Sequence, residues 1–250
     1  MQSSFVRLEI ENAVGTITFF TPDHNALPSV ILNELEEKIT DAKNNDQVKV
    51  LILKSGGDRT FCAGASFKEL IAITNKEEGK TFFMGFARVI LAMRACLKPI
   101  IVRVQGKAVG GGVGIAAAAD YCIATKFAAI KLSELSIGIG PFVIEPAVTR
   151  KLGVSASSEM TWNATKFYDP QWAKEKGLYS EVYDSLEETD LAIDSLAQNL
   201  ACYNPIALKE AKQVFWRDTD NWPVLLPKRA EISGSLVLSE FTKEKLKAYA

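Results

Sequence analysis

The chain has 250 residues, of which 48% are hydrophobic and 24% charged, as in a globular protein that buries a sizeable core. Its 29 basic and 30 acidic residues give a net charge of −1. This balance excludes a basic field for nucleic acid and a polybasic face for anionic lipid, so neither nucleic acid nor membrane is expected as a partner.

The four cysteines lie far apart in the sequence and lack the spacing of metal ligands, so we expect no metal site. Cys96, Cys122 and Cys202 stand in apolar or helical contexts, which predicts reduced thiols in the core. The N-terminus lacks the basic and apolar segments of a secretory signal, and no apolar run reaches membrane-spanning length. We therefore expect a cytoplasmic protein.

The first predicted elements are a β-hairpin and a helix. Phe5–Glu11 alternates apolar and polar residues, and after Gly15 the run Thr16–Phe20 predicts the partner strand. We expect Ser29 to cap a helix that ends near Asn44. The apolar stripe of that helix consists of Leu32, Leu35, Ile39 and Ala42.

Two further segments each place a strand, a loop of small residues and a helix in succession. Val48–Leu53 predicts a buried strand, Phe61–Phe67 is a loop, and a helix follows over Lys68–Ile73. A long helix over Lys76–Cys96 separates this segment from the second one. Two such loops place two sets of backbone amides where they can face one point.

The second segment is the centre of the chain. Ile100–Val104 predicts a buried strand, glycines then occupy positions 110, 111, 112 and 114, and Ile115–Ala119 is helix-forming. Backbone N–H groups at a helix start have no intrahelical acceptor, and glycine lets a ligand approach them. The arrangement suits an anion or a developing oxyanion. Close packing of two backbones selects the same residues, and the glycines alone do not separate the two interpretations.

The same glycines fit a relaxed dinucleotide-binding fingerprint. Gly112–Ala117 has the required pattern, and Glu134 lies about 20 residues further on. However, Gly106–Val109 separates the glycines from the strand, and the helix is too short for a crossover before the next strand at Tyr121. We therefore set the nicotinamide hypothesis aside.

The remaining elements favour an α/β fold with a helical C-terminal part. Tyr121–Ala124 and Ala128–Leu132 predict strands, so strands and helices alternate along the first half. After Glu145 every predicted element is helical, at 147–152, 155–162, 169–176, 187–201, 204–216 and 223–238. We expect a buried stripe on the 204–216 helix, formed by Ala207, Ala211, Val214 and Phe215.

Four stretches together resemble the crotonase superfamily, the enoyl-CoA hydratases and isomerases. Asn25-Ala26-Leu27 is similar to a motif near the N-terminus of that family. FCAGASFKEL at 61–70 and GKAVGGGVGIAAAAD at 106–120 are similar to its two oxyanion loops, and residues 173–182 to its A-x-x-x-G-L-V-x-x-V segment. The resemblance covers nearly the whole chain.

The resemblance implies a spiral of ββα turns over residues 1–190 and a helical region over 191–250 used in trimerisation. It also implies a homotrimer or homohexamer acting on an acyl-CoA thioester, with coenzyme A as part of the substrate and no separate cofactor. Fatty-acid metabolism is one pathway in which such an enzyme acts.

The resemblance also implies residue roles. The amides of Ala65 and Gly111 hold the thioester oxygen, and Glu134 is the acid–base group. The residues implied to bind the substrate, mainly at the coenzyme A entrance, are Ala63, Ser66, Phe67, Lys68 and Gly110. Lys68 either contacts a coenzyme A phosphate or is simply an exposed helix lysine, and the two interpretations stay open. We expect His24 to lie in a loop near the coenzyme A entrance.

The departures from the family pattern decide the expected chemistry. Hydratases of this family carry two glutamates, whereas the position of the first is Gly114 here and only Glu134 remains. Ser66 replaces the usual aspartate of the first loop, and Phe142 replaces the nucleophile of the dehalogenase branch, which disfavours dehalogenation. One carboxylate favours double-bond isomerisation or single-base hydration.

Several alternatives stay open at this point. Glu145 is a replacement second acid or the cap of a helix beginning at Pro146, and we favour the cap. Thioester hydrolysis, decarboxylation and non-catalytic acyl-CoA binding are the alternative functions, although retention of Glu134 argues against the last. The acyl group cannot be predicted, because five aromatic residues suit either a pocket or, as we favour, the core: Phe82, Phe83, Phe86, Phe142 and Trp162.

Overall fold

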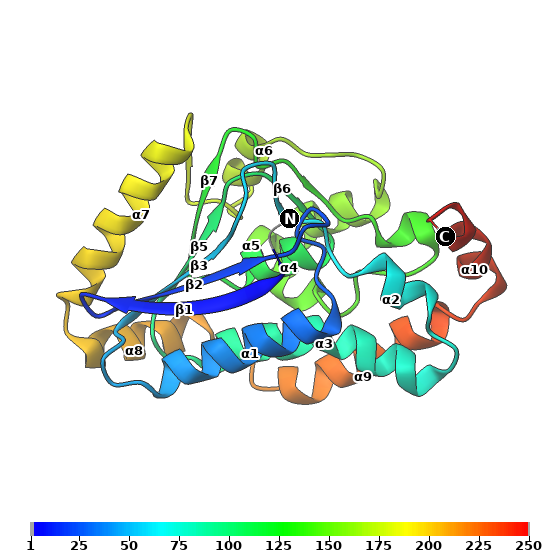
Figure 1. Cartoon of the computed structure of the whole chain (residues 1–250), viewed down its shortest axis with the longest axis horizontal. Helices are drawn as coiled ribbons and strands as arrows, with labels where there is room; N and C mark the ends of the chain where they lie inside the picture. The colour runs from blue at the N-terminus through cyan, green and yellow to red at the C-terminus, as the bar shows by residue number, and fades with distance from the viewer. Residues whose placement is uncertain (1–2, 250) are drawn as a thin grey trace.

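A computed structural model of the chain describes residues 3–249, which form two β-sheets surrounded by helices (Figure 1). The larger sheet has the strand order β1 (Phe5–Glu11), β2 (Val14–Phe20), β3 (Val50–Ser55), β5 (Ile100–Val104), β7 (Tyr121–Thr125) and β9 (Glu181–Tyr183). The smaller sheet has the order β4 (Thr60–Cys62), β6 (Lys107–Val109) and β8 (Ile130–Lys131). All pairings are parallel except that of β1 with β2.

Helices make up most of the remaining chain. The first group is α1 (Ser29–Asn44), α2 (Phe67–Ile71), α3 (Lys76–Ala95), α4 (Gly111–Ala117) and the 3₁₀ helix η1 (Glu134–Ile137). The second group is α5 (Glu145–Trp162), α6 (Pro170–Glu175), α7 (Leu186–Ala201), α8 (Pro205–Phe215), α9 (Trp222–Leu236), α10 (Glu240–Leu246) and the 3₁₀ helix η2 (Lys247–Tyr249).

The chain passes three times from the larger sheet to the smaller sheet and then into a helix. β3 leads to β4 and α2, β5 leads to β6 and α4, and β7 leads to β8 and η1. This repetition is the predicted ββα spiral, and the α/β fold class is confirmed. It also brings the ends of β4, β6 and β8 side by side, because they are neighbours in one parallel sheet.

Helices cover both faces of the larger sheet. Alternate residues of a strand point to opposite faces. Thus Val50 and Ile52 belong to a cluster beneath α7, whereas Leu51 and Leu53 belong to the main core. On the main-core side, α1 packs on α3 and α3 packs on α9, and these helices lie side by side in Figure 1.

The N-terminal elements agree with the sequence analysis except at the start of α1. The hairpin of β1 and β2 forms as predicted, and the apolar stripe of α1 is buried. Ser29 is not the cap: Pro28 precedes the helix, and Ser29 is its first residue. Glu69 accepts instead, because its Oε2 lies 2.9 Å from the Ser29 backbone nitrogen and 2.6 Å from its hydroxyl.

The C-terminal part differs from the prediction in three respects. It is not purely helical, because β9 joins the larger sheet beside β7. α10 is absent from the prediction, because its seven residues are too short to give a clear periodicity. The predicted boundary after residue 190 lies within α7, whose buried residues pack on the larger sheet.

The predicted buried stripe of α8 is wrong within this chain. Phe215 is 72% exposed and Val214 57% exposed. The buried residue of α8 is Lys212, whose Nζ lies 2.7 Å from Oδ2 of Asp120 and also donates to the carbonyls of Met93 and Lys98. Pairing of the ammonium lets the lysine stem turn inward and leaves the apolar face outward.

Cys202 is exposed at the end of α7, so its prediction as a core thiol is also wrong. The helix ends there and the side chain faces solvent. Cys96 and Cys122 are buried and free, as predicted.

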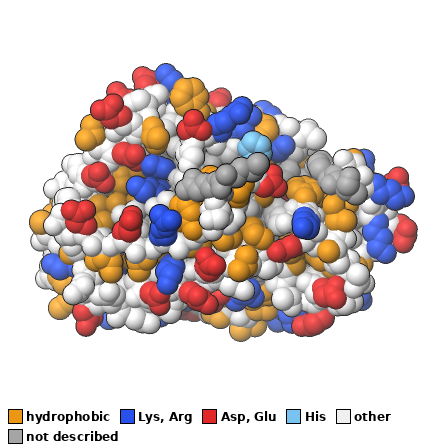
Figure 2. Space-filling view, in the orientation of Figure 1, with side chains coloured by type: hydrophobic (Ala, Val, Ile, Leu, Met, Phe, Trp, Pro, Cys, Tyr) orange, Lys and Arg blue, Asp and Glu red, His pale blue; other side chains and the backbone are white. Residues whose placement is uncertain are grey.

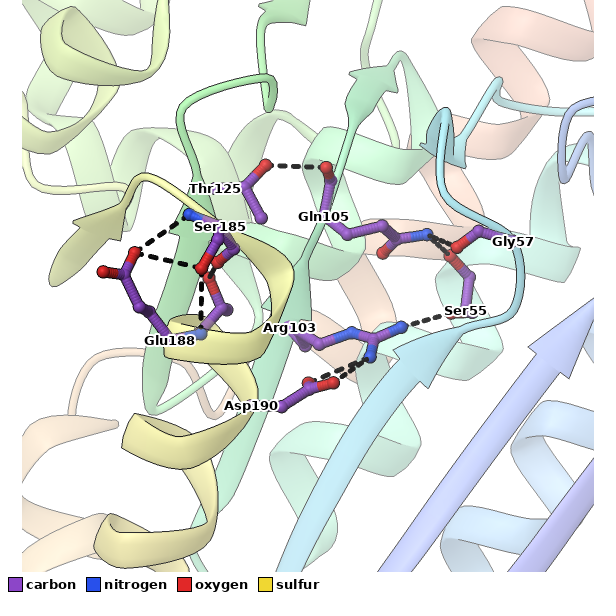
Figure 3. A network of polar contacts seen from close by, with 9 residues as sticks. Ser55, Gly57, Arg103, Gln105, Thr125, Ser185, Glu188 and Asp190 are labelled. Atoms are coloured by element: carbon purple, nitrogen blue, oxygen red, sulfur yellow. Dashed lines mark hydrogen bonds and ion pairs between the residues drawn. The ribbon is translucent and has the colours of Figure 1, made fainter.

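A polar network fixes the ends of β3 and β5 against α7 (Figure 3). Arg103 donates to Asp190 at 2.9 Å and to the carbonyl of Ser55 at 2.7 Å. The side-chain amide of Gln105 donates to the Ser55 hydroxyl at 2.8 Å, and the backbone carbonyl of Gln105 accepts from the Thr125 hydroxyl at 2.7 Å. These bonds hold three neighbouring strands just before the chain enters β4, β6 and β8.

On the face shown in Figure 2, Lys and Arg side chains are interspersed with Asp and Glu, without a large field of one sign. None of the described helices combines the length and the apolarity needed to span a bilayer. Within residues 3–249 there is also no group of three or more His, Cys, Asp or Glu side chains arranged to hold a metal ion.

Candidate active site

A cavity lies where the three strands of the smaller sheet end. The loops that follow β4, β6 and β8 contribute Ala65, Gly111 and Glu134 to its wall. Cys62 pairs with Ala108 in the sheet, so Ala65 and Gly111 each lie three residues beyond paired positions. The carboxyl ends of neighbouring parallel strands are the usual location of ligand sites in α/β folds. Strand register therefore brings the two predicted loops together.

The first loop is held by a backbone bridge to Leu27. The Leu27 N–H donates to Gly64 O at 2.8 Å, and the Ser66 N–H donates to Leu27 O at 3.2 Å. Successive amides of an extended segment point to opposite sides. The N–H of Ala65, between these two bonds, therefore points away from Leu27, and Ala65 lines the cavity.

The side chain of Asn25 supports the loop that carries Ala65. Its side-chain amide donates to the carbonyls of Gly56 at 2.9 Å and Thr60 at 2.8 Å, and its Oδ1 accepts from the Thr21 N–H at 2.9 Å. Asn25 is buried and has a positive φ of 56°. The Asn25-Ala26-Leu27 motif thus positions the loop that carries Ala65.

The second loop begins with Gly110, whose N–H donates to Lys131 O at 2.9 Å. Gly111 follows as the first residue of α4, so its own N–H has no acceptor within the helix. The ring of Phe86 lies against Gly111: a Cβ there would come 2.3 Å from the Phe86 ring. The backbone of Gly111 is therefore covered on one side and open to the cavity on the other.

Glu134 is the ionisable group of the cavity. Its Oε2 is buried and has no hydrogen-bond partner among the described residues. Burial raises the pKa of this carboxyl from 4.5 to about 7, which nearby backbone N–H groups and the charge of Lys131 only partly oppose. A carboxyl with a pKa near neutrality can both accept and return a proton.

The space beside Gly114, where the family resemblance predicts a second glutamate, is occupied by an apolar side chain. A Cβ on Gly114 would come 2.5 Å from Cγ2 of Ile144, and Ile144 lines the same cavity as Glu134. Gly114 is therefore required by the packing of α4 against this isoleucine. The chain therefore has no carboxylate at this position, and the side chain of Ile144 occupies the space that one would need.

Glu145 does not replace the missing group. It is the first residue of α5, where its Oε1 accepts from the Thr149 hydroxyl at 2.7 Å and its Oε2 lies 3.8 Å from Arg229. It is not among the described residues that line the cavity of Glu134. The predicted cap role of Glu145 is wrong: the helix begins one residue earlier than expected, so Glu145 is its first residue and Ile144 occupies the cap position.

The cavity gathers most of the residues assigned from the sequence. Those that line it are Ala63, Ala65, Phe67, Gly110, Gly111 and Glu134. Ser66 and Lys68 lie beside it at the start of α2, where the Ser66 hydroxyl caps the helix by accepting from the Glu69 N–H and Lys68 is exposed. His24 lies in the exposed loop before Asn25. The contacts of these residues with coenzyme A stay predictions.

Sequence reasoning assigned some residues of the cavity to the core and missed others. Phe82 and Phe86 are buried in the core as favoured, and Phe83 packs against it, but all three also line the cavity. Trp162 is 76% exposed and belongs to neither. Ile144 and Ser233 were not predicted. An apolar periodicity gives the buried face of α3 but not which part of that face borders a cavity.

Comparisons with known proteins agree with this architecture. A sequence model of the family described as enoyl-CoA hydratase/isomerase matches residues 9–249. The short-chain-enoyl-CoA hydratase of Clostridium acetobutylicum is 29% identical over 252 aligned residues, which cover 100% of this chain and 95% of that protein. The peroxisomal Δ(3,5)-Δ(2,4)-dienoyl-CoA isomerase of Arabidopsis thaliana is 27% identical over 231 residues, covering 86% of this chain and 81% of that protein.

A solved structure of an enoyl-CoA hydratase from Bacillus halodurans superimposes with a TM-score of 0.91 at 20% identity, covering 98% of this chain and 100% of that one. This likeness shows the fold, which is that of the crotonase superfamily. With the match of the family model, the chain belongs to the enoyl-CoA hydratase/isomerase family.

Proposed function

We propose that the protein moves a proton on an enoyl-CoA thioester, with Glu134 as the acid–base group and the amides of Ala65 and Gly111 as the oxyanion hole. The observation that carries this proposal is the unpartnered, buried carboxyl oxygen of Glu134 in the same cavity as these two loops. A carboxyl without a protein partner is available to a substrate, and its raised pKa suits proton exchange.

The proposed step is a transfer of one proton along the acyl chain. Glu134 removes a proton from C2, the C2–H bond breaks, and the electron pair is delocalised onto the thioester oxygen. The two amides hold the developing negative charge; loss of one such donor typically costs on the order of 10²–10³ in rate. The same carboxyl then protonates C4, so that the double bond moves from C3–C4 to C2–C3. Coenzyme A is part of the substrate, and the step needs no other cofactor.

The filled space at Ile144 favours isomerisation over hydration. Adding water requires a group that activates the water besides one that protonates the α-carbon. Gly114 supplies no side chain, and the methyl groups of Ile144 occupy the adjacent space. Relatives with either reaction in their names match the chain, so family membership alone does not choose between them.

The entrance is proposed to lie at the start of α2. Ala63 and Phe67 line the cavity there, and the exposed ammonium of Lys68 stands beside them where it can meet a coenzyme A phosphate. Ser66 serves this end chiefly by capping α2, because its hydroxyl accepts from the Glu69 N–H.

We also propose a homotrimer or homohexamer built through the C-terminal region. The exposed apolar side chains there include Tyr203, Ile206, Val214 and Phe215 on or beside α8. Contiguous exposed apolar groups mark interaction surfaces. Sedimentation of the wild type should give a trimer or a multiple of it, and Phe215→Asp should shift the mass toward the monomer; a wild-type monomer would contradict this assembly.

The reaction is tested with 2-enoyl-CoA and 3-enoyl-CoA side by side, by following the absorbance of the conjugated thioester. Isomerisation predicts that this absorbance appears from the 3-enoyl substrate. Its rapid loss from the 2-enoyl substrate in water would instead indicate hydration. No change with either substrate while the thioesters still bind would refute both, and leave thioester hydrolysis, decarboxylation or binding alone.

A further inference from the structure

Ser233 on α9 is a buried hydroxyl with no hydrogen-bond partner. The side chain is 0% exposed, and its Oγ has no hydrogen-bond partner within the described residues. Leaving a buried polar group unpaired is costly, so native proteins rarely do it without a reason. Ser233 lines the cavity that also contains Glu134. The unpaired hydroxyl of Ser233 therefore borders the cavity in which we propose that the substrate binds.

The position of Ser233 is set by close packing of α9 on α3. A Cβ on Gly79 of α3 would come 2.7 Å from the Cα of Gly234, so the two helix backbones touch beside Ser233. Phe82 and Phe83, one turn along α3, line the cavity next to this crossing. Because backbone contact holds the helix, the hydroxyl cannot easily turn away into solvent. Ser233 comes from a different part of the fold from the three loops that carry Ala65, Gly111 and Glu134.

Apart from Ser133, Glu134 and the backbone of the loops, the cavity wall around Ser233 is apolar, and none of the described lining residues is a cation. Leu70, Phe82, Phe86, Ile137 and Ile139 are among its members, and no Lys or Arg occurs among the described lining residues. An ionised carboxylate placed beside Ser233 would therefore be buried without an opposite charge, which is strongly unfavourable. Burying an uncharged oxygen costs only the desolvation of that oxygen, and one hydrogen bond with the Ser233 hydroxyl can offset this cost.

We propose that the acyl group of the substrate carries an uncharged oxygen, a hydroxyl or a carbonyl, beyond its reacting carbons, and that Ser233 hydrogen-bonds to it. The inference rests on the proposed function, because it assumes that an acyl-CoA occupies this cavity. It adds a residue that sets specificity: a hydrocarbon acyl chain would leave the Ser233 hydroxyl unpaired, and such sites discriminate against analogues that lack the partner.

The test is calorimetric binding of unreactive thioesters to the full chain. Butanoyl-, pentanoyl- and hexanoyl-CoA are compared with the thioesters of equal length that carry a terminal hydroxyl, and with glutaryl-CoA as the carboxylate-bearing member. Ser233→Ala removes the hydroxyl. Ser235→Ala, an exposed serine of α9 outside the cavity, is the matched control.

The wild type and Ser235→Ala should bind at least one hydroxylated thioester about three- to ten-fold more tightly than its hydrocarbon parent, the usual worth of one neutral hydrogen bond. Ser233→Ala should lose this preference. Its melting temperature should be equal or higher, because an unpaired buried hydroxyl is gone. A purely structural serine would not combine unchanged stability with lost discrimination.

Equal binding of each hydroxylated thioester and its parent would overturn the inference while leaving the proposed function intact. Preference of the wild type for glutaryl-CoA would overturn the assignment of an uncharged oxygen. Retention of the hydroxyl preference by Ser233→Ala would remove this residue from the site. If no thioester binds at all, the proposed function itself fails, and the inference fails with it.

Discussion

The carboxyl of Glu134 lies against the backbone of Gly110, so closely that a Cβ on Gly110 would come 2.8 Å from Oε1. Gly110 also has φ 53° and ψ −117°, a conformation that residues with a side chain rarely adopt. One glycine thus gives the carboxyl its position and opens the loop that carries the amide of Gly111.

Gly110→Ala should therefore impair both stability and activity. We expect a loss of stability on the order of 1–3 kcal/mol from the backbone conformation and a larger loss of activity from displacement of Glu134. Gly153→Ala is the matched control, because Gly153 has φ 74° and a Cβ added there would meet nothing within 4 Å. Melting curves and initial rates of both variants check this; an active Gly110→Ala would contradict the placement of Glu134.

The pH dependence of catalysis should report the pKa of Glu134. As a base, the carboxyl must be ionised in the free enzyme, and burial raises its pKa to about 7. We expect kcat/KM for isomerisation to rise with pH through about 7 and then level off. A profile already flat from pH 5 upward would show that the group that titrates is not this carboxyl.

The same pKa predicts how Glu134 affects stability. A carboxyl whose pKa is higher in the folded protein favours folding fully below its ordinary value, and this contribution is lost as pH rises through the folded pKa. The window here runs from 4.5 to about 7. Glu134→Gln should thus be more stable than the wild type at pH 8, by at most about 3 kcal/mol at 1.36 kcal/mol per pKa unit. The two proteins should converge at pH 4; denaturant titrations at both pH values measure the difference.

Restoring the missing glutamate should require room. Gly114→Glu alone should lose about 1–3 kcal/mol through overpacking against Ile144 and gain little hydration of 2-enoyl-CoA. Combining it with Ile144→Ala should recover part of the stability and raise the hydration rate. If the single variant hydrates well and stays stable, Ile144 does not exclude the second carboxylate.

Asn25→Asp tests the support of the loop that carries Ala65. An aspartate keeps the shape but cannot donate to the carbonyls of Gly56 and Thr60. We expect a loss of stability of about 1–3 kcal/mol and a lower kcat. Asn75→Asp is the control, because Asn75 accepts from the Glu78 N–H as a helix cap and aspartate caps equally well. Unchanged kinetics in Asn25→Asp would separate this motif from the site.

The larger elements of the fold could be predicted because their apolar patterns are long. The strand at Ile100–Val104 follows from an apolar, β-branched run, and the helix over Ser29–Asn44 follows from its apolar periodicity. The smaller sheet was harder to predict from the sequence, because β4 and β6 have three residues each, too few for a recognisable apolar pattern. Yet this sheet sets the register that brings the two loops together.

The site could be predicted through resemblance rather than periodicity. The glycines around Gly111 indicate an amide site without excluding close packing, and only the matching motifs single out Glu134. Sequence pattern also cannot say what covers an apolar face, so it assigns the exposed side of α8 at Phe215 to the core. Ser233 has no sequence signal, because its burial arises from the contact of two distant helices.

The central claim is that one carboxyl, Glu134, carries out the proton transfer. The most direct measurement is the rate of double-bond migration in 3-enoyl-CoA for the wild type, Glu134→Gln and Glu145→Gln, with each fold verified by circular dichroism. We predict a loss on the order of 10²–10⁴ for Glu134→Gln, the usual worth of a general acid–base group, and a near wild-type rate for Glu145→Gln. Substantial activity in Glu134→Gln, or its abolition in a folded Glu145→Gln, would contradict the account.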